Sequence, residues 1–211
     1  MTFVSLQAPI LARAESLYLF KLGYSYLPNS SSALNENLNT ICLGCGVGFH
    51  RTAGLGIEMG YQFSKRPFVL GLRYTNLKAT ATINAASGPV VAQNLLNTVE
   101  VLVGYRKKWR RFFFTPKIGY GIFNDSTFSF TNSAGTSFSG KAGSVQSLFY
   151  GLGTEWKLWR TLWGLEIGNT TLMAENFSSG GSTPASANSQ LTFSRIDFSG
   201  FYYLFTLGFQ Y

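Results

Sequence analysis

Large apolar side chains recur at every second position along most of the chain. The alternation fills nine runs, at residues 16–27, 40–50, 55–63, 68–75, 98–106, 112–122, 148–158, 163–170 and 200–211. Successive side chains of a β-strand point to opposite faces, so each run separates into an apolar face and a second face. The pattern therefore predicts an all-β protein.

The second face of these runs cannot form the core of a soluble domain. It consists mainly of glycine, threonine, glutamine and isolated charges. Its charged members are Lys21, Glu58, Arg73, Glu100, Arg106, Lys117, Glu155 and Glu166. If the apolar face instead meets lipid, the glycine-rich face can line a narrow interior in which these charges pair. We therefore predict a barrel whose apolar side chains point outward.

Closure and strand number follow from the membrane setting. An open sheet edge in hydrocarbon would leave backbone N–H and C=O groups unpaired, so we predict a closed antiparallel up-and-down transmembrane β-barrel. Nine runs do not fit the even strand numbers of single-chain bacterial barrels. Either residues 2–12 supply a tenth strand, or the run 16–27 lies outside an eight-stranded barrel. We favour eight strands, because the runs from residue 40 onward make a complete set.

Two kinds of connection alternate between the runs. The short ones are SKRP (64–67), RKKWRR (106–111) and KLWRT (157–161), and the long ones are about 76–97, 124–143 and 173–195. The long segments are rich in serine, asparagine, glycine, threonine and alanine. Short turns at one rim and long loops at the other are typical of outer-membrane barrels, so we expect long polar surface loops.

The chain of 211 residues has the length of one domain, which we assign to residues 16–211. No run of about 18 uncharged apolar residues is present in the sequence, which argues against a transmembrane helix. Residues 1–15 contain an apolar stretch and the triplet Ala12-Arg13-Ala14, which resembles a signal-peptidase site. They lack the basic start and the length of a complete signal. A signal remnant and a plain N-terminal arm are both open.

Basic residues outnumber acidic ones by 17 to 9, which gives a formal net charge of +8. A nucleic-acid-binding protein would cluster its basic residues on one face or along one helix. Here they gather in the short turns, at Lys65, Arg66, Lys107, Lys108, Arg110, Arg111 and Arg160. At a membrane rim each would lie near anionic headgroups, with up to about 1 kcal/mol of attraction. We therefore expect membrane lipid, and no nucleic acid, as a partner.

From residue 40 onward the chain resembles the small outer-membrane barrels of the OmpA/OmpX/OmpW type. The stretches that carry the resemblance are LGIEMGYQF, VEVLVGYRKKWRRFFFTPKIGYGIF, FYGLGTEWKLWRTLWGLEIG and the terminal YYLFTLGFQY. The last is similar to the C-terminal signal read by barrel-assembly machinery, although it ends on Tyr211 where phenylalanine is commoner. The resemblance implies a multi-pass barrel in an outer membrane of the Gram-negative type, and it carries no activity.

Two motifs are candidates for chemistry. Cys42 and Cys45 have the C-x-x-C spacing, but residues three apart on a strand point to opposite faces, so their sulfurs cannot meet. His50, the only histidine, has no serine two residues away and no acid at the spacing of a triad. One histidine and no carboxylate cluster also argue against a metal site. We expect no enzymatic activity and no cofactor, with a lipid A-modifying hydrolase as the enzymatic alternative.

The expected function follows from the fold and not from a motif. The inward charges either fill the interior as structural pairs or act as a gate whose re-pairing opens a narrow water path. Arg73 and Lys117 are the candidate counter-ions for the four inward glutamates. We expect a structural or interaction role, with another envelope or surface protein bound through the loops 124–143 and 173–195. The alternative is a narrow pore for small solutes.

Overall fold

The computed structural model describes residues 17–28, 51–63, 66–85, 88–132, 137–180 and 195–210. Its strands are β1 (Leu17–Pro28), β2 (Arg51–Gln62), β3 (Phe68–Ala85), β4 (Gly88–Tyr105), β5 (Lys107–Trp109), β6 (Phe112–Asn132), β7 (Ser137–Leu158), β8 (Thr161–Gly180), β9 (Arg195–Asp197) and β10 (Gly200–Gln210). No helix in these ranges is long and apolar enough to cross a bilayer. The first 15 residues, with the question of a signal remnant, lie outside the described part.

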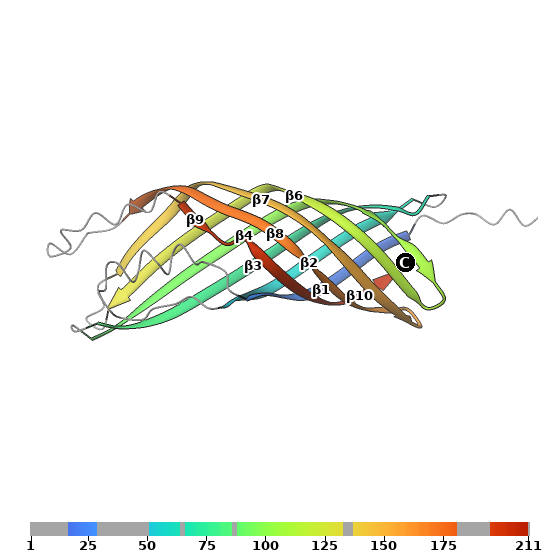
Figure 1. The fold of residues 1–211 in the computed structure, drawn as a ribbon, viewed down its shortest axis with the longest axis horizontal. Coiled ribbons are helices and arrows are strands. Elements are labelled where there is room, and N and C mark those ends of the chain that lie inside the picture. The colour runs from blue at the N-terminus through green and yellow to red at the C-terminus, as the bar shows by residue number, and fades with distance from the viewer. Residues whose placement is uncertain are drawn as a thin grey trace, which may run out of the picture.

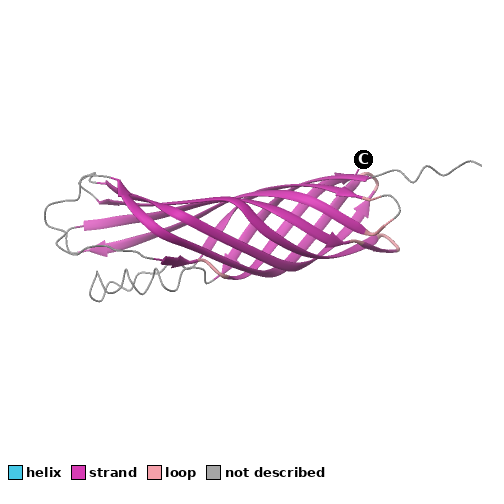
Figure 2. Ribbon diagram, turned by 90° about the horizontal axis from the view of Figure 1, so that it is seen from above, coloured by secondary structure: helices cyan, strands magenta, loops and turns pink. Residues whose placement is uncertain are grey.

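Eight of the strands close into a barrel (Figure 1; Figure 2). Each pairs antiparallel with the next in the order β1, β2, β3, β4, β6, β7, β8 and β10. The strand β10 then returns to β1 through a ladder from Leu19–Gln210 to Tyr26–Tyr203. The short strands β5 and β9 pair with β6 and β8 at the two rims. The predicted closed barrel of eight antiparallel strands is confirmed.

The choice of the eight strands differs from the sequence prediction. The expectation that the run 16–27 lies outside the barrel is wrong, because β1 forms ladders with both β2 and β10. The run 40–50 and residues 2–12 lie outside the described ranges. Alternation shows that a run can form a strand, but it does not show which neighbour completes its ladder. The sequence therefore predicts the number of strands in the barrel, but it does not predict which runs form them.

The outer face of the barrel is apolar and the inner face is charged. On β2 the side chain of Leu55 is 69% exposed and that of Glu58 is 5% exposed, and on β6 the values are 54% for Ile118 and 8% for Lys117. Keeping an apolar side chain of this size in water forgoes about 1.5–3 kcal/mol of burial. A belt of such side chains on all eight strands therefore requires a hydrocarbon environment.

The segments expected as long loops at one rim are strands over their described residues. The ladder of β3 and β4 continues to the pair Ala85–Gly88, and β6 and β7 pair again from Thr127–Lys141 to Thr131–Ser137. The strand β8 follows β7 as far as Gly180. The prediction of loops is therefore wrong for most of 76–97 and 124–143 and for residues 173–180, whereas 181–194 lie outside the described ranges.

The reason for this error is chemical. Beyond the apolar belt the outward positions of β3 are occupied by Lys78, Thr80 and Thr82, and the inward ones by Ala79 and Ala81. Small and polar residues are compatible with an outer face in water, so the contrast between the two faces becomes weak. These segments form what we call the β extension, the continuation of β3, β4, β6, β7 and β8 beyond the apolar belt, seen at the left of Figure 1.

Side chains fill the interior in layers, as expected for a barrel of eight strands. Nearest the short turns lies a lower apolar layer of Leu19, Val69, Phe113 and Leu162. Towards the β extension lies an upper apolar layer that includes Leu27, Leu77, Leu96, Phe128, Leu172 and Phe198. The inward charges lie between these two layers.

Candidate functional site

Strand register places four of the inward charges in one row. Lys21 on β1 lies opposite Glu58 on β2, Glu58 lies opposite Arg73 on β3, and Arg73 lies opposite Glu100 on β4. Residues directly opposite in an antiparallel pair have Cβ atoms about 4.5–5.5 Å apart. The row therefore alternates cation and anion across four strands.

Four further charges lie in the same part of the lumen. Arg106 follows β4, Lys117 lies on β6, Glu155 on β7 and Glu166 on β8. Together the eight form what we call the lumen charge cluster: Lys21, Glu58, Arg73, Glu100, Arg106, Lys117, Glu155 and Glu166. All eight side chains are buried, and seven of the eight barrel strands or their ends contribute one or more of them. The structure thus brings together all the inward charges identified in the sequence.

Arg73 and Lys117 share two carboxylates at the centre of the cluster. Arg73 Nη2 lies 2.7 Å from Glu58 Oε2 and 2.5 Å from Glu166 Oε1. Lys117 Nζ lies 2.7 Å from Glu58 Oε1 and 2.7 Å from Glu166 Oε2. The guanidinium of Arg73 also reaches Glu100, at 3.9 Å from Nη1 to Oε2. Two cations therefore hold the same two carboxylates from different walls.

Glu155 is held by a second pair of cations nearer the short turns. Lys21 contacts Glu155 Oε1 and lies 3.0 Å from Glu58 Oε1, so it links this pair to the centre. Arg106 donates to Glu155 Oε2 from Nε at 3.1 Å and from Nη2 at 2.7 Å, and to Gln62 Oε1 at 2.9 Å. Its guanidinium carbon lies 3.7 Å from the ring centre of Phe113, in cation–π geometry. The counter-ions of Glu155 are thus Lys21 and Arg106, and not the candidates suggested from the sequence.

The cluster contains four cations and four carboxylates, so its formal charges cancel. Burying an unpaired charge costs several kcal/mol, and proteins tolerate buried charges when they are paired and hydrogen-bonded. Each carboxylate here has at least one cation within 4 Å. The arrangement therefore satisfies buried charge within a closed interior.

Three polar residues complete the cluster and were not singled out from the sequence. The hydroxyl of Tyr202 donates to Glu166 Oε1 at 2.7 Å, and Ser147 Oγ donates to Glu100 Oε1 at 2.8 Å. Gln62 accepts from Arg106, as described above. Tyr202 and Gln62 both lie on the second face of their runs, and a buried tyrosine hydroxyl usually has a partner. Their position on the inward face of each run was the signal in the sequence that could have identified them.

Little free volume lies between the cluster and the upper apolar layer. A cavity of about 30 Å³ is lined by Arg73 and Glu100 on one side and by Leu27, Leu77 and Leu172 of the upper apolar layer on the other. This is room for about one water molecule. In the described residues, the lumen is therefore packed where the cluster meets the upper apolar layer.

Comparison with known proteins bears on the fold. No family model matches the chain, and no curated protein matches it. Among solved structures the chain is similar to a major outer membrane protein from Thermus thermophilus, with a TM-score of 0.55, 10% identity, and coverage of 93% of this chain and 100% of that chain. The chain has the fold of an outer-membrane β-barrel.

Two further solved structures have lower TM-scores. The outer membrane protein OprG from Pseudomonas aeruginosa has a TM-score of 0.48 and 13% identity, with 93% of this chain and 96% of that chain covered. The outer membrane protease OmpT from Escherichia coli has a TM-score of 0.45 and 7% identity, with 94% and 97% covered. At such identities the likeness concerns the fold alone.

The remaining candidate residues of this outer-membrane barrel fall into two groups. The basic turn residues Arg66, Lys107, Lys108, Arg110, Arg111 and Arg160 are exposed at the rim of the short turns, and Lys65 lies outside the described ranges. Cys42, Cys45 and His50 also lie outside them. In the described part of the chain, no group of three or more histidine, cysteine or acidic residues could hold a metal ion.

Proposed function

We propose that the chain is a non-enzymatic, integral outer-membrane protein whose barrel is a closed anchor for the β extension. The observation that carries this proposal is the lumen charge cluster, which is neutral, paired and enclosed between two apolar layers. Water and solutes would have to separate these pairs and cross apolar side chains, which constrict a path by excluding water. A packed lumen of this kind supports a structural role better than a conducting one.

The β extension supports the interaction part of the proposal. Its inward side chains, such as Ala92 and Phe128, are buried in the upper apolar layer, and outward ones such as Lys78 and Thr80 are exposed and polar. An outer face of this composition belongs in water, so the extension would project from the membrane. We therefore transfer the partner-binding role from the expected loops to the β6–β7 and β7–β8 parts of this extension, within residues 124–143 and 173–195.

A narrow pore is the second candidate, and one observation favours it. Glu58 lies within 3.0 Å of cationic nitrogens from Lys21, Arg73 and Lys117, so it could keep a partner while another leaves. A gate that exchanges partners in this way would open without leaving a bare carboxylate. The measurement that separates the two candidates is single-channel conductance.

The test starts from protein refolded from urea into detergent micelles. An unheated sample that migrates differently from a boiled one on an SDS gel would establish the closed barrel. In planar bilayers we expect no channel openings from this material. Openings whose conductance changes in Arg73→Ala or Glu100→Ala would overturn the closed anchor and establish the pore.

The β extension is tested by shortening one hairpin. Thr127 and Lys141 are paired, so residues 128–140 can be replaced by Asn-Gly, which favours a two-residue hairpin turn. We expect the full chain to form cross-linked products at the cell surface, and we expect this variant to lose them while it keeps the gel shift. Unchanged products would contradict the interaction role.

A further inference from the structure

Two neighbouring hairpins at the rim of the short turns carry all four tryptophans of the chain. Trp109 lies on β5, Trp156 on β7, Trp163 on β8, and Trp159 in the turn between β7 and β8. The hairpins β5–β6 and β7–β8 are adjacent because β6 pairs with β7. Tryptophan rings favour the headgroup level of a membrane. One sector of the rim is therefore set apart from the rest.

The same two hairpins carry a concentration of unpaired cations, namely Lys107, Lys108, Arg110, Arg111, Lys157 and Arg160. In the described part of the chain none of them forms an ion pair, since the rim-side carboxylate, Glu155, is buried and held by Lys21 and Arg106. A hollow of about 340 Å³ lies between the hairpin tips, lined by Lys108, Arg110, Arg111, Lys157 and Trp159 among others. Its charge is complementary to an anionic group.

The backbone conformation and the exposure of Trp159, a turn residue, do not contribute to the stability of the barrel. Its backbone has a φ of 56°, in the left-handed region, and its side chain is 90% exposed. A residue other than glycine in this region costs on the order of 1 kcal/mol, and the exposed ring recovers little of it through packing. Arg110, in the turn of the other hairpin, has the same φ of 56°. Both side chains are available to surrounding molecules.

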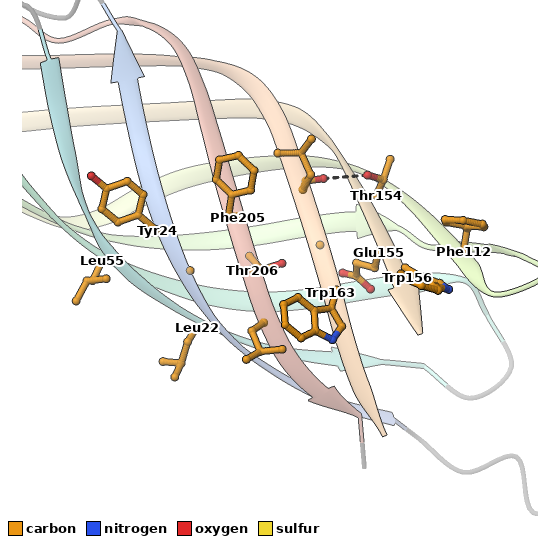
Figure 3. A pocket seen from close by; sticks show the side chains of 14 residues that line it. Leu22, Tyr24, Leu55, Phe112, Thr154, Glu155, Trp156, Trp163, Phe205 and Thr206 are labelled. Carbon is orange, nitrogen blue, oxygen red and sulfur yellow. Dashed lines mark hydrogen bonds between the residues drawn. The ribbon is translucent and has the colours of Figure 1, made fainter. Parts of the chain in front are cut away.

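An apolar groove of about 570 Å³ runs over the outer wall beside these hairpins (Figure 3). Its walls come from β1, β2, β6, β7, β8 and β10, and Figure 3 labels Leu22, Tyr24, Leu55, Phe112, Trp156, Trp163 and Phe205 among them. The groove is therefore an apolar depression in the outer wall, which faces hydrocarbon.

The groove and the cationic hollow adjoin along the chain. Trp156 lines the groove and Leu158, on the same outer face of β7, lines the hollow. The rings of Phe112 and Trp156 stack, with centroids 6.4 Å apart. Arg111 directly precedes Phe112 at the turn of one hairpin. A molecule with an apolar tail in the groove would thus meet cations at its polar end.

We propose that this sector is a binding site for an anionic phospholipid, with an acyl chain in the groove and the phosphate at Arg111 and Lys157, which line the hollow from the two hairpins. The inference rests on the membrane placement proposed above. The site differs from general attraction to a charged bilayer, because the cations and tryptophans lie on two hairpins that also form part of the groove wall. A uniform basic rim would distribute them around the barrel.

The tryptophans supply the readout. The refolded protein is reconstituted into phosphatidylcholine vesicles that contain one of two brominated lipids. These are phosphatidylglycerol brominated on its acyl chains and phosphatidylcholine brominated in the same way. Quenching of tryptophan fluorescence by each lipid is measured. We expect the brominated anionic lipid to quench more strongly, with a relative binding constant at least roughly threefold higher. The double variant Arg111→Gln/Lys157→Gln should lose this preference.

The matched control removes two charges elsewhere, in Lys65→Gln/Arg66→Gln between β2 and β3, and should keep the preference. Equal quenching by the two lipids in the unmodified protein, or the same loss in both variants, would overturn the site. An absence of quenching by either lipid, together with no gel shift, would instead refute the membrane barrel itself. The two failures are therefore distinguishable.

Discussion

Arg73 and Glu166 are separated by 93 residues, yet Nη2 of the arginine lies 2.5 Å from Oε1 of the glutamate. Their strands, β3 and β8, are four places apart in the barrel in either direction. The contact therefore spans the lumen and ties opposite walls together. It also connects the row of charges on β1 to β4 with the far side of the barrel.

Replacing Arg73 with alanine should strongly destabilise the barrel. The change leaves Glu58 and Glu166 with less compensation in a buried site, and removal of one partner of a buried ion pair costs about 3–5 kcal/mol. The free energy of unfolding, measured by urea titration in micelles, should fall by that order. Lys78→Ala, on the exposed face of the same strand, is the control and should change it by less than about 0.5 kcal/mol.

A double variant separates charge from packing at this position. In Arg73→Ala/Glu166→Gln one of the uncompensated carboxylates is removed, so part of the lost stability should return. If the double variant is as unstable as the sum of the two single ones, the pair is not coupled and the proposed tie across the lumen is wrong.

The hydroxyl of Tyr202 should contribute through its hydrogen bond to Glu166. Hydrogen bonds to charged groups contribute about 1.5–3 kcal/mol, so Tyr202→Phe should lower the free energy of unfolding by that amount. Tyr203 points outward on the same strand, and Tyr203→Phe is the matched control. Equal effects in the two variants would show that the hydroxyl of Tyr202 does not support the cluster.

Gly168 should not tolerate a side chain. A Cβ at this position would lie 2.7 Å from Gly151 Cα and 2.8 Å from Cε1 of Tyr202, and the backbone of β7 cannot move away without breaking its ladder. Gly168→Ala should cost about 1–3 kcal/mol, measured as an earlier loss of the folded gel band with urea. Gly153→Ala is the control, since its Cβ would meet its nearest neighbour at 3.5 Å.

The β extension should be visible in hydrogen exchange. Amides in the paired segments 127–131 and 137–141 should exchange roughly a hundredfold more slowly than those of Arg110 and Arg111 in the short turn. Mass spectrometry of peptides from the reconstituted protein measures this. Exchange of 127–131 as fast as in the turn would restore the interpretation of this segment as a loop.

Sequence reasoning identified the faces of the strands but not their partners. The parity of Glu58, Arg73 and Glu155 within their runs predicts correctly that they point inward. Parity cannot show that Glu155 pairs with Lys21, because that contact depends on how the ends of the sheet meet. The β extension was missed for a related reason, since its small residues give two faces of similar polarity.

The alternating row from Lys21 to Glu100 has a consequence for how the strands find one another. If β3 slipped by two residues against β2, the side-chain faces would be preserved, but Glu58 would lie opposite Gly71 or Thr75 in place of Arg73. The same slip of β1 would put Lys21 opposite Gly56 or Gly60. A two-residue slip of either strand, which keeps the apolar belt outside, would thus leave buried charges without the partner opposite. The row of charges therefore disfavours register errors that the apolar pattern alone would allow.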